Sequence, residues 1–230
     1  MRTREEIKEA AREALSQQRG TGILIMLTLV AVSIVSTIID LVISFSVGEG
    51  ILYWVVSIAG TFVIYVVSVN VVGEYIKIYK GETASPGAVI SEMGVNFGRK
   101  LGGMLLMSLY ISLWSLLFII PGIIKSFAYF FTPNILAEHP NVSASQAIDI
   151  SKRITHGHKM EIFVFCFSFI GWLLLSILTL GILAVVYVGP YFYTADAGLY
   201  LELKEKALAE GIISPEELGM ETADEFAAYN

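Results

Sequence analysis

A few polar side chains interrupt long apolar stretches of this sequence, and these are the residues that could carry chemistry. Asp40 lies in the first apolar stretch, and Lys125 lies near the start of the fourth. If both stretches cross a membrane, the two side chains meet near its outer face, which predicts an ion pair and an outer polar site for a phosphate or carboxylate group. The alternative is that Lys125 extends its ammonium group to the outer headgroups while its stem stays buried.

A second polar set lies near the opposite ends of the apolar stretches. Asn70 and Glu74 are four residues apart, so they share one face of a helix. Asn134 and Asp196 lie at a comparable depth in two other stretches. The four residues predict an inner polar site that opens to the cytoplasm and could bind a cation or carry protons. The alternative is hydrogen bonding between helices, which contributes about 0.6 kcal/mol per contact.

Metal and enzyme chemistry find little support in the sequence. His156 and His158 are two residues apart and would point in different directions on a helix, and no Cys or carboxylate near them completes a zinc-like spacing. The nucleophile elbow, the zinc-protease motif, the Walker A loop and the dinucleotide glycine fingerprint are all missing. We therefore expect no metal, no cofactor and no catalytic residues.

The composition is that of a membrane protein. The 230 residues are 55% hydrophobic and 16% charged, whereas about a quarter of the residues in a soluble domain are charged. A helix needs about 20 apolar residues to cross a bilayer. Six spans are predicted, at residues 20–47, 51–78, 101–120, 122–138, 160–180 and 183–202. The fourth is near the lower length limit and could instead be a re-entrant or interfacial helix.

The positive charges orient these spans. Of the 15 Lys and Arg residues, all except Lys125 lie in segments that alternate with corners free of cations. These corners are at residues 47–50, at Pro121-Gly122 and at residues 180–182. Since basic loops stay in the cytoplasm, the pattern predicts three membrane hairpins with both chain termini inside.

Each hairpin is expected to follow a cytoplasmic amphipathic helix. The three helices begin at Thr3, at Ser85 and at Ser143, and the first and last of these are followed three residues later by Glu or Gln, which predicts capping boxes. Such helices can lie in the headgroup layer or pack on the cytoplasmic ends of the bundle. The cations and the histidine that follow them predict a headgroup boundary at Arg99, Lys100, His158 and Lys159.

The domain organisation follows from this repeat. Residues 1–206 form a single polytopic domain with repeat-like units at 1–80, 81–140 and 141–206. Residues 207–230 form an acidic cytoplasmic tail. The single cysteine, Cys166, excludes an intramolecular disulfide.

The second half of the chain carries several short motifs in a specific order. They are Pro121 to Lys125, Ser151-Lys152, Gly157-His158-Lys159, Ser168 to Trp172, Thr179-Leu180-Gly181 and Pro190-Tyr191. This series resembles the DUF975 family of bacterial integral membrane proteins, whose function is unknown. More distantly, the chain is similar to the membrane domain of some glycerophosphodiester phosphodiesterases, but their catalytic barrel is missing here. The resemblance implies a fold and a location and leaves the chemistry open.

Two function classes remain as predictions. The first is a non-enzymatic polytopic protein of the bacterial plasma membrane that interacts with lipids or organises partners, either another protein or a second copy of itself. The alternative is a small transporter, export-accessory or immunity-type membrane protein that uses the polar sites. Nucleic acid is not an expected partner, because the cations are spread along the loop edges.

Overall fold

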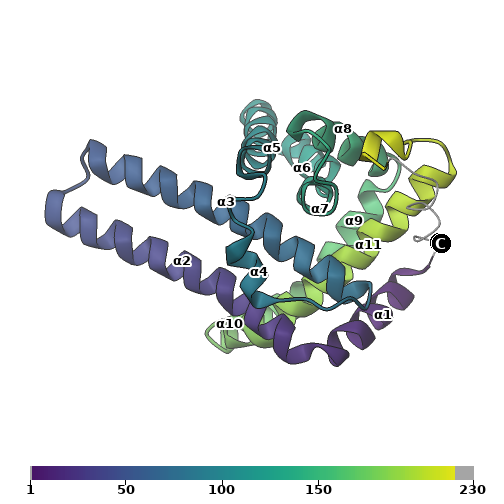
Figure 1. Ribbon diagram of the computed structural model, residues 1–230, viewed down its shortest axis with the longest axis horizontal. Helices are drawn as coiled ribbons and strands as arrows, with labels where there is room; N and C mark the ends of the chain where they lie inside the picture. The colour runs from purple at the N-terminus through teal and green to yellow at the C-terminus, as the bar shows by residue number, and fades with distance from the viewer. Residues whose placement is uncertain (1, 221–230) are drawn as a thin grey trace.

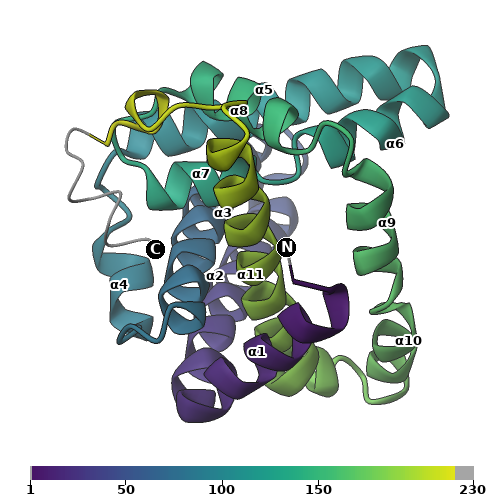
Figure 2. The same ribbon diagram turned by 90° about the vertical axis from the view of Figure 1, so that its right-hand side faces the viewer.

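A computed structural model describes residues 2–220, and every regular element in this range is helical (Figures 1 and 2). The predicted all-α class is confirmed. The helices in chain order are α1 (Arg4–Gln17), α2 (Arg19–Val47), α3 (Ile51–Tyr79), α4 (Pro86–Ser91), α5 (Phe97–Leu117), α6 (Ile119–Ala128), α7 (Thr132–Glu138), α8 (Ala144–Ile154), α9 (Lys159–Phe167), α10 (Ile170–Leu178), the π-helix η1 (Ala184–Val188), α11 (Gly189–Ala209) and the 3₁₀ turn η2 (Glu216–Leu218).

Local sequence signals set the starts of the short helices. The hydroxyl of Thr3 accepts a hydrogen bond from the backbone N–H of Glu6, and the Glu6 carboxylate accepts one from the Thr3 backbone in return. Ser143 and Gln146 form the same arrangement at the start of α8. Both capping boxes were predicted from the sequence, and both are confirmed. Pro86 is the first residue of α4, where its missing N–H leaves no hydrogen bond unmade.

Two 29-residue helices form a long apolar arm. α2 and α3 lie side by side and are joined by a short turn at residues 48–50 (Figure 1). Gly48 occupies the left-handed region with a φ of 78°, which glycine adopts without steric cost. At the tip of the arm, Phe45 and Ile51 are each more than four-fifths exposed. The two helices begin and end within one residue of the first two predicted spans.

The second reversal of the chain lies earlier than predicted. α5 ends at Leu117 and α6 begins at Ile119, so the chain turns at Phe118, which has an extended backbone. The predicted corner at Pro121-Gly122 is therefore wrong. Pro121 lies instead in the first turn of α6, where backbone N–H groups have no helical partner and a proline is tolerated.

Two of the apolar segments are interrupted helices. α6 gives way to α7 at residues 129–131, just before Pro133 in the first turn of α7. The break has a physical cause, because a proline cannot donate the hydrogen bond that would continue a helix. α9 and α10 are separated at Ser168-Phe169.

Five helical segments in the described range are long and apolar enough to cross a membrane. They are Arg19–Val47, Ile51–Tyr79, Phe97–Leu117, Ile119–Glu138 and Lys159–Leu178. The segment 183–202, predicted as a sixth span, is not among them. Its helix, α11, carries Asp196 and Glu202 and packs between α1 and α3 (Figure 2).

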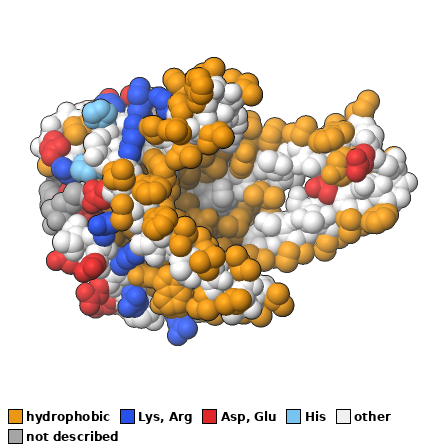
Figure 3. Space-filling view, turned by 180° about the vertical axis from the view of Figure 1, so that it is seen from behind, with side chains coloured by type: hydrophobic (Ala, Val, Ile, Leu, Met, Phe, Trp, Pro, Cys, Tyr) orange, Lys and Arg blue, Asp and Glu red, His pale blue; other side chains and the backbone are white. Residues whose placement is uncertain are grey.

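The core lies around α11, and the arms stay exposed. Buried aromatic residues fill this core, with Phe131, Phe165 and Tyr200 among the largest fully buried side chains. Ile7 and Ala11 of α1 are also fully buried, because α1 packs along α11. The apolar face of α1 is thus covered by protein. Figure 3 shows hydrophobic side chains along the α2–α3 arm, and the Lys and Arg side chains visible on this face lie away from the tip of the arm, on the body of the molecule.

Candidate functional site

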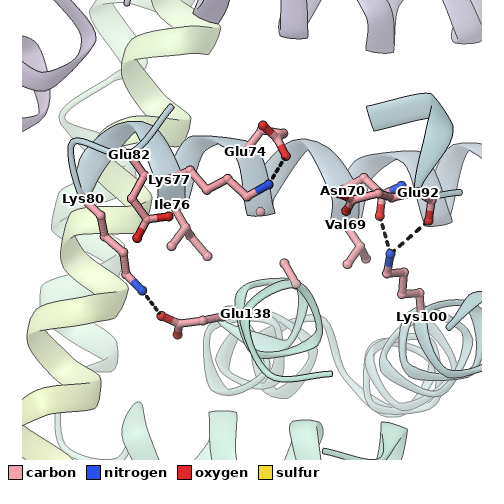
Figure 4. Close-up of a pocket in the computed structure, with 12 residues that line it drawn as sticks. Val69, Asn70, Glu74, Ile76, Lys77, Lys80, Glu82, Glu92, Lys100 and Glu138 are labelled. Atoms are coloured by element: carbon pink, nitrogen blue, oxygen red, sulfur yellow. Dashed lines mark hydrogen bonds and ion pairs between the residues drawn. The ribbon is translucent and has the colours of Figure 1, made fainter. Parts of the chain in front are cut away.

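A polar pocket of about 270 Å³ lies where α3, α5 and α7 meet (Figure 4). We call it the inner pocket. It is lined by charged and amide side chains together with four apolar or small residues: Asn70, Glu74, Lys77, Lys80, Glu82, Glu92, Lys100 and Glu138, with Val69, Gly73, Ile76 and Ala137. The pocket therefore offers both signs of charge within a small space.

A buried lysine closes one end of the inner pocket. The Lys100 ammonium donates hydrogen bonds to the Asn70 side-chain oxygen at 2.6 Å and to the Glu92 backbone oxygen at 3.4 Å. The Asn70 amide in turn donates to the Val89 backbone oxygen at 2.9 Å. These contacts join α5 to α3 and α3 to α4. They supply the polar partners without which burying an ammonium group would be strongly unfavourable.

Glu74 holds the segment that leads into α4. One of its carboxylate oxygens lies 2.6 Å from the Lys77 ammonium, and the other accepts a hydrogen bond of 2.7 Å from the Ser85 backbone N–H. Ser85 is the residue before α4, and its own side chain makes no capping bond. Both oxygens of this buried carboxylate are thus satisfied.

Glu138 is the centre of a charged cluster at the other end of the inner pocket. Its carboxylate lies 2.7 Å from the Lys80 ammonium, 2.6 Å from the Lys204 ammonium and 2.7 Å from the Tyr200 hydroxyl. The Glu138 and Lys204 side chains are only 5% and 2% exposed. We call Glu138, Lys80, Tyr200, Lys204 and His139 the Glu138 cluster. It joins α7 to α3 and α11.

Burial sets the electrostatics of this cluster. The His139 ring nitrogen Nε2 lies 3.0 Å from the Glu138 carboxylate. Burial lowers the pKa of His139, and the Glu138 carboxylate opposes that shift. Burial also lowers the pKa of Lys204, again opposed by Glu138. A buried carboxylate with several cationic partners holds its neighbours in place.

The structure divides the predicted inner site into two. Asn70 and Glu74 line the inner pocket, as described above. Asn134 and Asp196 lie elsewhere in the core, where the Asn134 amide donates a hydrogen bond of 3.0 Å to one Asp196 oxygen. The other oxygen of Asp196 is buried and has no hydrogen-bond partner within residues 2–220. The four residues are therefore not one constellation.

The predicted outer pair is not brought together. Among the described residues, no ion pair joins Asp40 and Lys125. Asp40 lies in the outer part of the α2–α3 arm, whereas Lys125 lies on α6, which folds back along α5. The Lys125 ammonium stands 4.6 Å from the centre of the Trp114 ring, a cation–π contact between these two helices.

The residues predicted to mark the headgroup boundary mostly have partners within the chain. The Arg99 guanidinium donates to the backbone oxygens of Leu136 at 2.7 Å, His139 at 3.2 Å and Val142 at 3.1 Å. It therefore satisfies carbonyl groups at the C-terminus of α7. Lys100 lies in the inner pocket, and Lys159 is half-buried at the start of α9.

His158 also binds within the chain. One ring nitrogen lies 3.0 Å from the Glu161 carboxylate and the other 3.1 Å from the Lys206 ammonium. Over residues 2–220, no group of three or more His, Cys, Asp and Glu side chains is placed to hold a metal ion.

The Glu138 cluster was not predicted from the sequence. Its one signal was a carboxylate followed by a histidine at the end of an apolar stretch. The lysines that complete it are 58 and 66 residues away in the chain. Their meeting depends on how α3 and α11 pack, which local patterns do not report.

Comparison with known proteins identifies the family. The model of the family described as "Protein of unknown function (DUF975)" matches residues 1–127 and residues 116–207. No curated protein and no solved structure matches the chain, and the distant likeness to glycerophosphodiester phosphodiesterases has no support. The matched residues run from the first helix nearly to the end of α11. The chain belongs to the DUF975 family.

Proposed function

We propose that this chain is a non-enzymatic, multi-pass protein of the bacterial plasma membrane that interacts with lipids or organises partners at its cytoplasmic face. The observation that carries the proposal is the separation of surface types. The α2–α3 arm exposes apolar side chains, and the Lys and Arg side chains visible in Figure 3 lie on the body from which the arm projects. Such a surface is unfavourable in water and matches a bilayer with its headgroup layer.

The proposed topology has six spans arranged as three hairpins, with both termini in the cytoplasm. Support comes from the packing of α1 on α11. Arg2 forms an ion pair of 3.4 Å with Glu202, so the start of the chain lies beside the last turns of the final long helix. An N-terminus and a C-terminal helix on the same side of a membrane require an even number of crossings. The segment 183–202 would then be the sixth.

The non-enzymatic part of the proposal rests on how the buried charges are used. Glu74 and Glu138 both have cationic partners and both connect helices. A general base needs a free site near a substrate, whereas these carboxylates are occupied with structural contacts. This arrangement favours a role in binding and organisation.

The alternative is a small transporter, export-accessory or immunity-type membrane protein. The specific observation in its favour is the inner pocket, whose volume of about 270 Å³ suits a small solute. Because the pocket presents both ammonium and carboxylate groups, a zwitterion such as an amino acid would suit it best.

Cysteine labelling tests the topology. In a Cys166→Ser background, Glu49→Cys reports the first predicted outer corner and Ala209→Cys reports the end of α11. With a membrane-impermeant maleimide on intact cells, we expect Glu49→Cys to react and Ala209→Cys to react only after the membrane is opened. Reaction of Ala209→Cys in intact cells would overturn the six-span topology.

A second experiment separates the two function classes. The full chain is reconstituted in proteoliposomes, and uptake of radiolabelled amino acids is compared between wild type, Glu74→Gln and Lys100→Met. The proposed function predicts no uptake above protein-free vesicles in any sample, together with co-purifying lipid in native mass spectra. Uptake that is lost in both variants, with insertion unchanged, would favour the transporter.

A further inference from the structure

A second cavity shares no lining residue with the inner pocket. It has a volume of about 140 Å³ and lies between the α1–α2 junction and the segment from η1 into α11. Its floor is apolar, with Leu15, Ile23 and Pro190, and its rim carries Arg12 and Arg19. We call it the arginine groove. An apolar floor below a cationic rim is the pattern of an amphiphilic ligand, which has one charged end and one apolar end.

The arginines of the groove are not neutralised by carboxylates. Both side chains are exposed, and within residues 2–220 neither forms an ion pair. The lysines at the inner pocket differ, because Lys77 and Lys80 each pair with a glutamate. The arginine groove is therefore a place where cationic charge is available to an external anion.

The aromatic wall of the groove orients one guanidinium. Arg12 stands 5.3 Å from the centre of the Tyr191 ring, and Tyr187 lies beside that ring on the same wall. Arg12 also hydrogen-bonds to the Tyr191 and Tyr187 side chains, which leaves its remaining N–H groups for phosphate oxygens. Tyrosine rings with polar tips are also typical of the boundary between headgroups and acyl chains.

The groove lies at the start of the first apolar arm. Arg19 is the first residue of α2, the helix with the most apolar of the candidate spans, and Ile23 lies one turn further into that helix. Gly189 lets the opposite wall approach α2 closely, since a Cβ atom there would lie 2.9 Å from the Met26 methyl carbon. The guanidinium groups thus mark the point at which the apolar arm begins.

We propose that the arginine groove binds an anionic phospholipid. Arg12 and Arg19 bind the phosphate oxygens, and an acyl chain lies over Ile23 and the Tyr187 ring. The apolar floor commits the site to a lipid, because a free phosphate ion would leave that floor unused. This inference rests on the proposed membrane function and names its lipid class and its site. Basic pockets between membrane helices are known anionic-lipid sites.

Native mass spectrometry of the full chain tests the proposal. The protein is extracted in mild detergent and titrated with phosphatidylglycerol or with phosphatidylcholine of the same acyl chains. The variant is Arg12→Gln/Arg19→Gln. The matched control is Arg4→Gln/Lys152→Gln, which removes two exposed cations that lie away from the groove. We expect the groove variant to bind phosphatidylglycerol at least tenfold more weakly, with the control and the phosphatidylcholine titrations unchanged.

Further comparisons in this experiment define the outcomes that would overturn the proposal. An equal loss in the control would mean a general charge effect, and no loss in the groove variant would mean that lipid binds elsewhere. A third variant, Ile23→Phe, fills the floor and keeps both arginines, so it should weaken lipid binding too. Competition by inorganic phosphate at equal potency would identify a small-anion site.

The same experiment also separates this inference from the proposed function. If the wild type and the groove variant retain lipid equally, only the assignment of the lipid site to the arginine groove is overturned. A wild type that retains no lipid of either kind contradicts the lipid-binding form of the proposed function as well. Unchanged melting temperatures of the variants would show that any loss of binding does not arise from unfolding.

Discussion

The Glu138 cluster allows a quantitative prediction about stability. In Glu138→Gln the neutral amide keeps the shape of the side chain and removes a negative charge 2.6 Å from the Lys204 ammonium, whose side chain is 2% exposed. Removing one partner of a buried ion pair costs about 3–5 kcal/mol. For a chain of this size, about 1 kcal/mol corresponds to roughly 2–4 °C, so we expect the melting temperature to fall by about 6–20 °C.

A surface ion pair of the same chain provides the matched control. Arg153 and Glu217 lie 2.8 Å apart, with side chains 31% and 43% exposed. Solvent screens such a pair, and it contributes about 0–1 kcal/mol. Glu217→Gln should therefore lower the melting temperature by no more than about 4 °C. The assay is thermal unfolding of the detergent-solubilised protein, followed by intrinsic fluorescence.

A double substitution checks the physical cause. Glu138→Gln/Lys204→Met removes the buried ammonium along with the carboxylate charge, so it should recover a large part of the stability that Glu138→Gln alone loses. The reasoning would be refuted if Glu138→Gln melted within a few degrees of Glu217→Gln. It would also be refuted if the loss of stability in the double variant exceeded the summed losses of Glu138→Gln and Lys204→Met measured singly.

Three further predictions concern single residues. Burial lowers the pKa of His139 below its ordinary value of 6.5, so the unfolded chain binds a proton more readily than the folded chain does. The stability that this residue contributes is therefore present above about pH 6.5 and is lost as the pH falls further. Melting curves should show that wild type loses more stability than His139→Gln between about pH 7.5 and pH 5.5. Gly122→Ala places a Cβ atom 2.8 Å from the Cα atom of Ser115 and should destabilise by about 1–3 kcal/mol in denaturant unfolding, whereas Gly171→Ala, with open space around it, should not. Thr3→Ala removes a capping bond and should cost about 0.5–2 kcal/mol by the same measurement.

Features of the fold that depend on neighbouring residues were predictable from the sequence. The capping boxes at Thr3 and Ser143 need only a hydroxyl and a partner three residues later, and both formed as predicted. The bounds of α2 and α3 follow from the length of their apolar stretches and from the glycines between them. The corner near Pro121 was misplaced, because proline suits the first turn of a helix as well as the turn before it.

The candidate site depended on contacts between distant segments, and the sequence reported it only in part. Asn70 and Glu74 were chosen because they share a helix face, and they do line the inner pocket together. Asn134 and Asp196 were grouped with them by estimated depth alone, which carries no information about direction around the bundle. Lys100 was expected at the headgroup boundary, yet an amide on α3 is its partner in the interior.

The burial of α11 bears on the proposed sixth span. Twelve of its 21 residues are buried, against two of 29 in α2. A helix surrounded by protein needs side chains that suit its neighbours, and polar groups such as Asp196 are tolerated there when they face the interior of a bundle. A helix that faces lipid on most sides must be apolar around its circumference. A central sixth helix would be buried in the way that α11 is buried, and it could therefore fall below the apolarity expected of a span. Labelling at Ala209→Cys decides whether α11 crosses the membrane.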